Sequence, residues 1–380
     1  MRNAILPRLK GFSFFSTLLL LVFCCLTSVA NRVEAQTNAY VTNLSQKAVN
    51  VIDTATNTVV ATILFGPEFI GDQPLGIAIS PDGTRAYTTH VISDTVSVID
   101  TATNLVIDSI PVGHGPAGIA VSPDGKRVYT ANSSEATVSV IDTTTNTVIT
   151  TIPDVPSQAI AVTPDGTRAY AVVGGRTTVI DTATNTVIAA ILNGVTAVAV
   201  AITPDSSRAY VTDVVFNRVF AVDTATNTVI ATIPVGLFPQ GIAVAPDGTR
   251  VYTADRDSDT VSVIDVDTNS LIATIPVGLH VHDVAITPDG TRAYAAGDQL
   301  NVNSGVAVID TATNTVLTTV AVPGFPFEIA ITPAPSPTSK EECKNGGWKN
   351  FGSSAGPFKN QGQCISLVEK RSVSQRLQLK

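Results

Sequence analysis

The chain has 380 residues, of which 44% are hydrophobic and only 14% are charged, with a formal net charge of −8. Threonine, valine, alanine and asparagine are abundant, which is typical of β-rich proteins because branched side chains suit a pleated, half-buried surface. Residues 36–339 carry 11 lysines and arginines against 27 aspartates and glutamates, whereas residues 340–380 carry 8 against 3. The acidic body argues against nucleic acid as the main partner, because it would repel phosphates.

The N-terminal segment has the pattern of a secretory signal. Arg2, Arg8 and Lys10 precede the apolar stretch 12–30, and Val33-Glu34-Ala35 offers a cleavage site before Gln36. We therefore expect residues 1–35 to be a signal peptide, and the mature protein to be secreted, periplasmic or on the bacterial cell surface. An uncleaved membrane anchor is the alternative, because the apolar run is about long enough to cross a bilayer. No other segment of the chain is predicted to span a membrane.

A repeat of about 42 residues occupies most of the remaining chain. An aspartate that follows a short apolar strand recurs at spacings of 47, 42, 39, 42, 42 and 45 residues, at Asp53, Asp100, Asp142, Asp181, Asp223, Asp265 and Asp310. Between these anchors a Pro-Asp-Gly-type turn recurs at Pro81, Pro123, Pro164, Pro204, Pro246 and Pro288, with a weaker copy at Pro333. Four short strands per repeat at this period predict an all-β fold, a β-propeller of four-stranded antiparallel blades.

One copy, from Gly241 to Pro276, shows how a blade is expected to form. Its predicted strands are Gly241–Ala245, Arg250–Ala254, Thr260–Asp265 and Leu271–Pro276. Glycine in the Pro-Asp-Gly turn is suited to positive φ, and so is the asparagine of the recurring Asp-Thr-Ala-Thr-Asn turn between the third and fourth strands.

The two ends of the repeat region complete each other. Residues 39–43 read as a second strand with no first strand before them, and residues 327–333 read as a first strand with no second strand after them. Three strands from one end and one from the other make a seventh blade. This closure removes the open sheet edge that would otherwise invite aggregation.

At this point the repeat resembles a known family. Residues 40–43 (Tyr-Val-Thr-Asn), 128–132 and 137–142 resemble the YVTN-type propeller repeat of bacterial and archaeal secreted and surface proteins, which is similar in fold to lactonase-type propellers. The resemblance covers residues 39–333 and implies the fold more than an activity. It places the propeller domain at residues 36–333.

A linker and a small basic motif follow the propeller. Residues 334–342 read as a stiff Pro/Ser-rich linker, and residues 343–380 form a Cys-bounded basic motif. Cys343 and Cys364 are expected to form a disulfide, because the chain is bound for an oxidising compartment. The motif resembles a short C-terminal segment found on assorted bacterial extracellular proteins. Its aromatic and basic residues suggest attachment to the cell envelope, or a small knob packed on its own aromatic side chains.

Candidate site residues gather in the connections on one propeller face. All four histidines are expected in these loops: His90 between a second and a third strand, and His114, His280 and His282 between blades. Two neighbouring blades also carry carboxylates, Asp283 and Glu328, where the other blades have small residues: Gly76, Gly118, Ala159, Ala199 and Gly241. These six residues form the candidate ligand or metal face.

Two metal sites are conceivable from residue type and spacing. Asp255, Asp257 and Asp259 alternate as calcium ligands do, although the glycine and distal glutamate of an EF-hand loop are missing. His280, His282 and Asp283 combine imidazoles with a carboxylate, which suits a transition metal. The alternative in both cases is a solvated polar loop, so no cofactor is expected and a divalent metal stays the secondary hypothesis.

Enzyme signatures are weak. The propeller has no cysteine and no Gly-x-Ser-x-Gly motif, and residues 113–118 match the dinucleotide fingerprint only as a string, because a strand and not a helix follows. We therefore expect a binding scaffold that recognises a protein or glycan partner at the propeller face. The alternatives are a metal-assisted lactonase-type hydrolase with a site at Asp283, Glu328 and His282, and a structural component of the cell envelope.

Overall fold

The computed structural model describes residues 37–66, 72–299 and 304–334, together with the isolated residues 344, 352, 353, 356, 357 and 365; of residues 193–195 it gives the backbone alone. The chain divides into two compact units, Met1–Ala35 and Gln36–Lys380. All described residues belong to the second unit, so the predicted signal peptide lies outside them. No helix among the described residues is long and apolar enough to cross a membrane.

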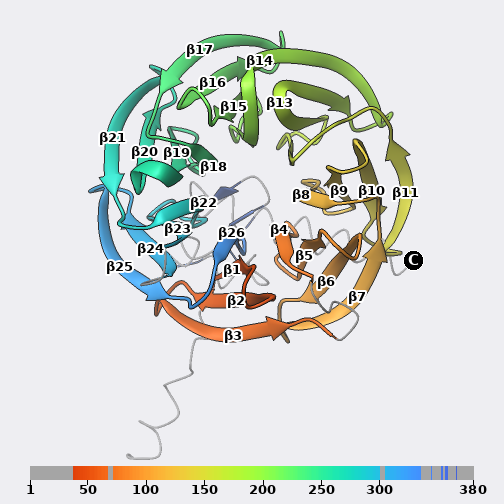
Figure 1. Ribbon diagram of the computed structural model, residues 1–380, viewed down its shortest axis with the longest axis horizontal. Coiled ribbons are helices and arrows are strands. Elements are labelled where there is room, and N and C mark those ends of the chain that lie inside the picture. Colours follow the sequence, from red (N-terminus) through yellow and green to blue (C-terminus); the bar gives the residue numbers. More distant parts are fainter. Residues whose placement is uncertain are drawn as a thin grey trace, which may run out of the picture. The chain divides into compact units, whose positions relative to one another are not determined.

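The described strands form a ring of antiparallel sheets (Figure 1). Five sheets of the ring have four strands each, and one has six strands in which two blades are joined. The result is a seven-bladed propeller, as the repeat predicted. The inner strand of each blade contacts the inner strands of both neighbouring blades, so the ring of inner strands closes around the axis.

The blades are numbered here in chain order, with strands given from the axis outward. Blade 1 has β4 (Pro74–Ile79), β5 (Arg85–His90), β6 (Thr95–Asp100) and β7 (Leu105–Pro111). Blade 2 has β8 (Pro116–Val121), β9 (Arg127–Asn132), β10 (Thr137–Asp142) and β11 (Thr147–Ile152). Blade 5 has β18 (Pro239–Val244), β19 (Arg250–Asp255), β20 (Thr260–Asp265) and β21 (Ser270–Pro276), with the 3-10 helix η2 (Arg256–Ser258) between β19 and β20. Blade 6 has β22 (His280–Ile286), β23 (Arg292–Asp298), β24 (Gly305–Asp310) and β25 (Thr315–Ala321).

Blades 3 and 4 share the six-stranded sheet. It consists of β12 (Ala159–Val162), β13 (Arg168–Asp181), β14 (Thr186–Ile202), β15 (Arg208–Asp213), β16 (Arg218–Asp223) and β17 (Thr228–Pro234). The long strand β13 covers the second and third positions of blade 3, with Gly174 at φ 54° inside it. The strand β14 runs from the outer position of blade 3 to the inner position of blade 4. The repeat did not predict which strands become continuous, although its copy from Asp142 to Asp181 is the shortest, at 39 residues.

Blade 7 joins the two ends of the repeat region. It has the order β26 (Pro326–Ile331), β1 (Asn38–Asn43), β2 (Ala48–Asp53) and β3 (Thr58–Leu64). The strands β1 and β26 pair antiparallel, with Tyr40 opposite Ala330. The predicted closure by the terminal strands is confirmed. A further two-stranded sheet, β27 (Gly352–Ser353) with β28 (Gly356–Pro357), lies beyond the propeller sequence.

The turns adopt the conformations that their residues favour. The asparagine between the third and fourth strands has a φ of 50° to 55° in every blade, at Asn57, Asn104, Asn146, Asn185, Asn227, Asn269 and Asn314. In the Pro-Asp-Gly turns the glycine is also left-handed, for example Gly83 at φ 73°. Asparagine and glycine tolerate this region better than other residues. These two sets of turns lie on one face of the ring, here called the turn face, and the connections on the opposite face make up the loop face.

Tyrosines connect each blade to the next. The chain has seven tyrosines, one in the second strand of each blade, and all are fully buried. Four of their hydroxyls donate to the left-handed asparagine of the following blade: Tyr40 to Asn104, Tyr170 to Asn227, Tyr210 to Asn269 and Tyr294 to Asn57, at 2.6 to 3.0 Å. The sequence analysis found the asparagines but not this use of them.

Arginines form a second set of connections between blades. In blades 1 to 6 the first residue of the second strand is arginine, and its Nη1 donates to a backbone carbonyl in the outer turn of the next blade. Arg250, for example, donates to the carbonyl of Thr311 at 2.6 Å. Blade 7 has Asn38 at this position, opposite Asp53 just as Arg250 is opposite Asp265. The closing blade is therefore joined to blade 1 without an arginine.

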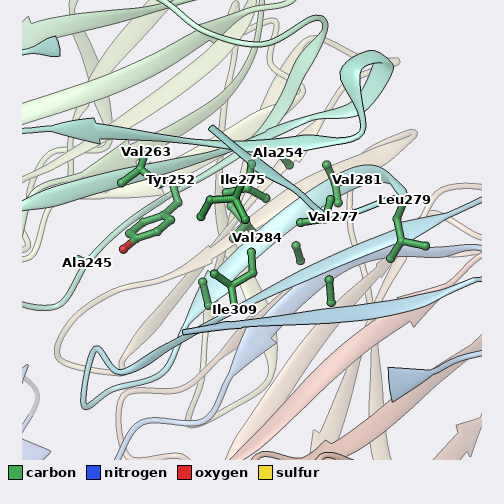
Figure 2. Packing of buried hydrophobic residues seen from close by; sticks show 14 residues of the cluster. Ala245, Tyr252, Ala254, Val263, Ile275, Val277, Leu279, Val281, Val284 and Ile309 are labelled. Atoms are coloured by element: carbon green, nitrogen blue, oxygen red, sulfur yellow. The ribbon is translucent and has the colours of Figure 1, made fainter. Parts of the chain in front are cut away.

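The hydrophobic core is divided among the interfaces between blades. Figure 2 shows the cluster between blades 5 and 6, where Val263 and Ile275 of one blade face Val284 and Ile309 of the next. Burying one such side chain stabilises the fold by about 1.5–3 kcal/mol. Because each cluster needs two blades, the ring holds its loop face as a rigid platform.

Candidate functional site

The loop face carries the predicted histidines, but three of the four are strand residues. His90 is the last residue of β5, and His280 and His282 lie in β22. Only His114 lies in a loop, between β7 and β8. The prediction that all four lie in loops was therefore wrong, because the strands of this propeller extend further toward the loop face than the apolar pattern indicates.

His90 is a buried structural residue. Its Nε2 lies 2.9 Å from the Ser97 hydroxyl and its ring meets Phe65 edge-on, with the ring centroids 4.5 Å apart. The Asp72 carboxylate lies 3.8 Å from Nδ1. Burial lowers the pKa of His90 to about 4, although Asp72 acts in the opposite direction. Asp72 also accepts hydrogen bonds from the backbone of Ile92 and Ser93, so this pair holds the loop of blade 1 in place.

His114 lies at the surface, in the connection between blades 1 and 2. Its side chain is 74% exposed, and its Nδ1 lies 2.6 Å from the Asp94 carboxylate of blade 1. The hydrogen bond to Asp94 raises the pKa of His114. No contact joins His114 to the other candidate residues among the described parts of the chain. It therefore connects two loops and does not complete a metal site.

His282 is buried and fully engaged. Its Nε2 lies 2.7 Å from Asp298 and its Nδ1 lies 3.0 Å from the Gln240 side chain. The rings of Phe325 and Phe327 pack against the imidazole, with centroids 4.7 and 5.2 Å away. Burial lowers the pKa of His282 against the influence of Asp298. Both ring nitrogens therefore have partners within the protein.

Asp283 and Glu328 form the most unusual part of the candidate face. They lie on the inner strands β22 and β26, where Asp283 accepts a hydrogen bond from the amide of Ile329, and Glu328 accepts one from Ile77, each at 3.1 Å. Each carboxylate thus reaches the inner strand of the following blade. Asp283 also packs on Gly241 of blade 5, where an added Cβ would meet its Oδ1 at 2.3 Å. Asp283 and Glu328 thus replace small residues of the other blades, as predicted. Asp283 contacts blades 5 and 7, and Glu328 contacts blade 1.

The surroundings of Asp283 and Glu328 favour the protonated form of both carboxyl groups. Both side chains are partly exposed, yet protein surrounds them closely on the inner strands. Burial raises the pKa of Asp283 to about 7. Burial, followed by the Asp283 charge, raises the pKa of Glu328 to about 8. Two buried carboxyls, one of which has its ionisation disfavoured by the charge of the other, can hold one proton near neutral pH.

The three aspartates of the predicted calcium loop lie in different surroundings. Asp255 is fully buried at the end of β19, where it accepts hydrogen bonds from Ser262 at 2.6 Å and Thr253 at 2.8 Å. Burial raises the pKa of Asp255 to about 6. Asp257 lies within η2, and Asp259 ends that helix at φ 56°. The short helix separates the three carboxylates and replaces the expected solvated loop.

The candidate metal ligands of the inner strands have partners within the protein. Among the described residues, no three histidine, cysteine, aspartate or glutamate side chains converge as metal ligands. Asp283 and Glu328 supply two carboxylates, and the neighbouring His282 already has both nitrogens engaged. Cys343 and Cys364, the predicted disulfide, lie outside the described residues.

Sequence reasoning missed the partners that hold these groups. Asp72, Asp298 and Gln240 gave no signal of their own, since each becomes a histidine partner only when distant segments meet. It also missed the surroundings of Arg218, which lies between the rings of Phe216 and Phe220. A usable signal existed there, because blade 4 has Val-Val-Phe at residues 214–216 where blade 2 has Ser-Ser-Glu at residues 133–135.

Comparison with known proteins supports the fold. The family model described as "Lactonase, 7-bladed beta-propeller" matches residues 109–274, which is less than half of the chain and includes neither Asp283 nor Glu328. No curated protein matches the sequence. Hydrazine synthase from Kuenenia stuttgartiensis is similar over 70% of this chain and 90% of its own, with 27% identity and a TM-score of 0.62. A functionally unknown protein from Desulfotomaculum acetoxidans DSM 771 is similar over 78% of this chain and 99% of its own, with 19% identity and a TM-score of 0.68.

Proposed function

We propose that this chain is a secreted or cell-surface binding scaffold, whose propeller presents its loop face to a partner protein. The observation that carries the proposal is that several side chains with reactive chemistry are buried and form hydrogen bonds within the protein. His90, His282 and Asp255 are buried and hydrogen-bonded within or between blades. They position loops and are not presented to a substrate.

The construction of the ring supports the same proposal. Tyrosine and arginine hydrogen bonds cross from blade to blade, and β26 closes the ring against β1. A rigid surface loses little conformational entropy when it binds, which favours recognition without a large rearrangement. The predicted signal peptide supplies the route to the cell surface.

Site-specific photo-crosslinking in producing cells tests the scaffold function. A photoreactive residue replaces Ile92, Glu135 or Leu237 on the loop face, or Thr144 or Ala183 on the turn face, one position at a time. We expect a discrete adduct with a partner protein from at least one loop-face position and none from the turn face. Adducts confined to the turn face, or none at any position, would contradict the proposal.

A lactonase-type hydrolase is the second candidate. Two observations favour it: the family match at residues 109–274 and the carboxyl pair with raised pKa values. In that case Glu328 or Asp283, retaining a proton near neutral pH, would serve as a general acid. Lactone turnover that disappears in Glu328→Gln would establish this candidate.

A further inference from the structure

A second group of residues on the loop face departs from the repeat and leaves apolar and guanidinium groups exposed. The propeller contains nine arginines, and six of them form the connections on the turn face. Of the other three, Arg218 and Arg256 lie on the loop face of blades 4 and 5, and Asn217 and Phe238 connect their segments. We name their surroundings the arginine–phenylalanine surface, consisting of Val215, Phe216, Arg218, Leu237, Phe238 and Arg256.

Backbone hydrogen bonds make this surface continuous. Asn217, in the turn before Arg218, accepts from the amide of Phe238 at 2.9 Å. The carbonyls of Phe238 and Leu237 accept in turn from the amides of Arg256 and Asp257, each at 3.1 Å. Three segments, residues 214–218, 235–238 and 256–258, are thereby held together as one rigid patch.

The surface is apolar and open. Among the described residues, four large apolar side chains outside the outer strands are more than half exposed: Ile92 at 66%, Val215 at 54%, Phe216 at 53% and Leu237 at 52%. Three of these four belong to the arginine–phenylalanine surface. Clustered exposed apolar side chains of this kind mark interaction sites more often than scattered ones do.

Both arginines are fixed in place with hydrogen-bonding capacity to spare. The Arg218 guanidinium lies 4.6 and 4.7 Å from the ring centres of Phe216 and Phe220, and its Nε donates to the buried Asp213 at 3.0 Å. Neither Nη atom of Arg218 has a hydrogen-bond partner in the described part of the chain. Arg256 lies 5.5 Å from the Phe238 ring and is 38% exposed, and its Nη1 is 4.0 Å from the Asp257 carboxylate, which is beyond hydrogen-bond distance. Arginines that lie over aromatic rings and whose Nη atoms make no hydrogen bond favour carboxylates, which they bind through two parallel hydrogen bonds.

Phe238 adds a sign that the aromatic ring matters at this place. Its φ is 56°, in the left-handed region that disfavours large side chains. At the corresponding position between blades 1 and 2, before the same proline, the repeat has Gly115 at φ 62°. The chain thus keeps an aromatic ring beneath Arg256 where the connection between blades 1 and 2 has glycine.

We propose that the arginine–phenylalanine surface binds an acidic, apolar peptide segment of the partner protein, with its carboxylates on Arg218 and Arg256 and its apolar side chains on Val215, Phe216 and Leu237. This inference rests on the proposed scaffold function and adds the chemistry of its partner. The two guanidinium groups disfavour the basic C-terminal segment 340–380 as the occupant. An acidic polysaccharide matches the arginines but offers no aliphatic or aromatic side chains to the three apolar residues.

Selection from a random peptide library displayed on phage tests the proposal with the chain from Gln36 to Lys380. We expect enrichment of peptides that combine Asp or Glu with Leu, Ile or Phe. Binding of a synthetic copy, measured by fluorescence anisotropy, should weaken about tenfold or more in Arg256→Gln, Arg218→Lys and Phe238→Gly. Phe238→Gly suits the left-handed backbone, and Arg218→Lys keeps a cation beside Asp213 while removing the planar fork, so these variants are expected to fold.

The control is Lys126→Gln, which removes one positive charge from the turn face and should leave affinity unchanged. Peptides that bind equally to all variants would overturn this site while leaving the scaffold function standing, and so would enrichment of basic peptides. Polygalacturonate that binds where no peptide does, with the same dependence on Arg256, would assign the surface to glycans. Self-association abolished by the same variants would assign it to a second copy of the chain. Either result would overturn the proposal.

Discussion

At the level of single residues, departures from the repeat consensus were the best guide to the candidate site, and their outcomes differ. His282 stands where other blades have residues such as Leu75 and Ala117, and it is held by Asp298 and Gln240. Asp283 and Glu328 occupy the inner strands as the alignment of the repeats predicted. Their hydrogen bonds join residues 46 and 251 positions apart, to Ile329 and Ile77. Such partners are not readable from spacing, because they depend on how neighbouring blades are set against each other.

The carboxyl pair should make stability depend on pH. The folded pKa values of about 7 and about 8 lie above the ordinary value of about 4 for an unfolded chain. The folded protein therefore keeps protons that the unfolded chain releases, and stability falls as pH rises from about 4 to about 8. Glu328→Gln keeps an oxygen for the Ile77 amide and cannot ionise. We expect the urea midpoint of Glu328→Gln, measured relative to that of the wild type, to rise between about pH 5 and about pH 9.

Asp257→Asn, on the exposed helix η2, serves as the control for that measurement. Its midpoint relative to the wild type should change little over the same pH range, because Asp257 is 51% exposed. An equal difference between Glu328→Gln and the wild type at both ends of this range would show that Glu328 does not retain its proton in the folded protein.

The tyrosine hydroxyls offer a matched pair of substitutions. Tyr294 donates to the Thr54 carbonyl at 3.1 Å and to Asn57 at 2.6 Å, whereas the buried hydroxyl of Tyr129 has no hydrogen-bond partner in the described part of the chain. We expect Tyr294→Phe to lower the free energy of unfolding by about 1 kcal/mol and Tyr129→Phe to lower it by clearly less. Urea denaturation of both variants measures the difference. Equal losses in the free energy of unfolding would mean that the hydrogen bonds of the Tyr294 hydroxyl do not contribute to stability.

At the level of strands and turns, the sequence predicted much of the structure because the repeat supplied seven copies of each signal. The predicted strand Thr260–Asp265 is β20 without change, and Arg250–Ala254 is one residue shorter than β19. The exception is blade 3, where the spacing of 39 residues from Asp142 to Asp181 goes with the continuous strand β13. A shortened copy indicates a lost connection, but it does not say which strands become continuous.

The missing arginine of blade 7 suggests a stabilising substitution. Asn38 occupies the arginine position, and its side-chain oxygen is buried without a hydrogen-bond partner among the described residues. We expect Asn38→Arg to reach the outer turn of blade 1 and to raise the free energy of unfolding by about 0.5–1.5 kcal/mol. Asn38→Gln, which lengthens the side chain without the guanidinium, is the control. A variant no more stable than this control in urea would show that the closing interface cannot accept the connection.

At the level of the whole molecule, the ring depends on its closing strand. A chain that ends at residue 322 lacks β26 and leaves the edge of β1 unpaired, whereas a chain that ends at residue 339 keeps the pairing. We expect the shorter chain to lose its sharp urea transition and its resistance to limited proteolysis, and the longer one to keep both. Equal resistance of the two chains would mean that six complete blades and a three-stranded seventh suffice to hold the ring.

The fold followed from the sequence far more completely than the function did. A repeated period predicts architecture because every copy must pack against the next, while function resides in the residues that break the repeat. Some of these residues, such as His90 and Asp255, proved to be internal supports. Others, such as Phe238 and Arg256, passed without notice because phenylalanine and arginine carry no catalytic signature.

The central claim is that the predicted reactive groups serve the blades and not a substrate. The most direct test is turnover of a panel of five- and six-membered lactones by the purified chain from Gln36 to Lys380, with and without added divalent metals, beside its Glu328→Gln and Asp283→Asn variants. We predict that none of the three proteins hydrolyses a lactone faster than buffer does. Hydrolysis by the wild type that falls about a hundredfold or more in a folded Glu328→Gln protein would contradict the account, because it would make the carboxyl pair catalytic.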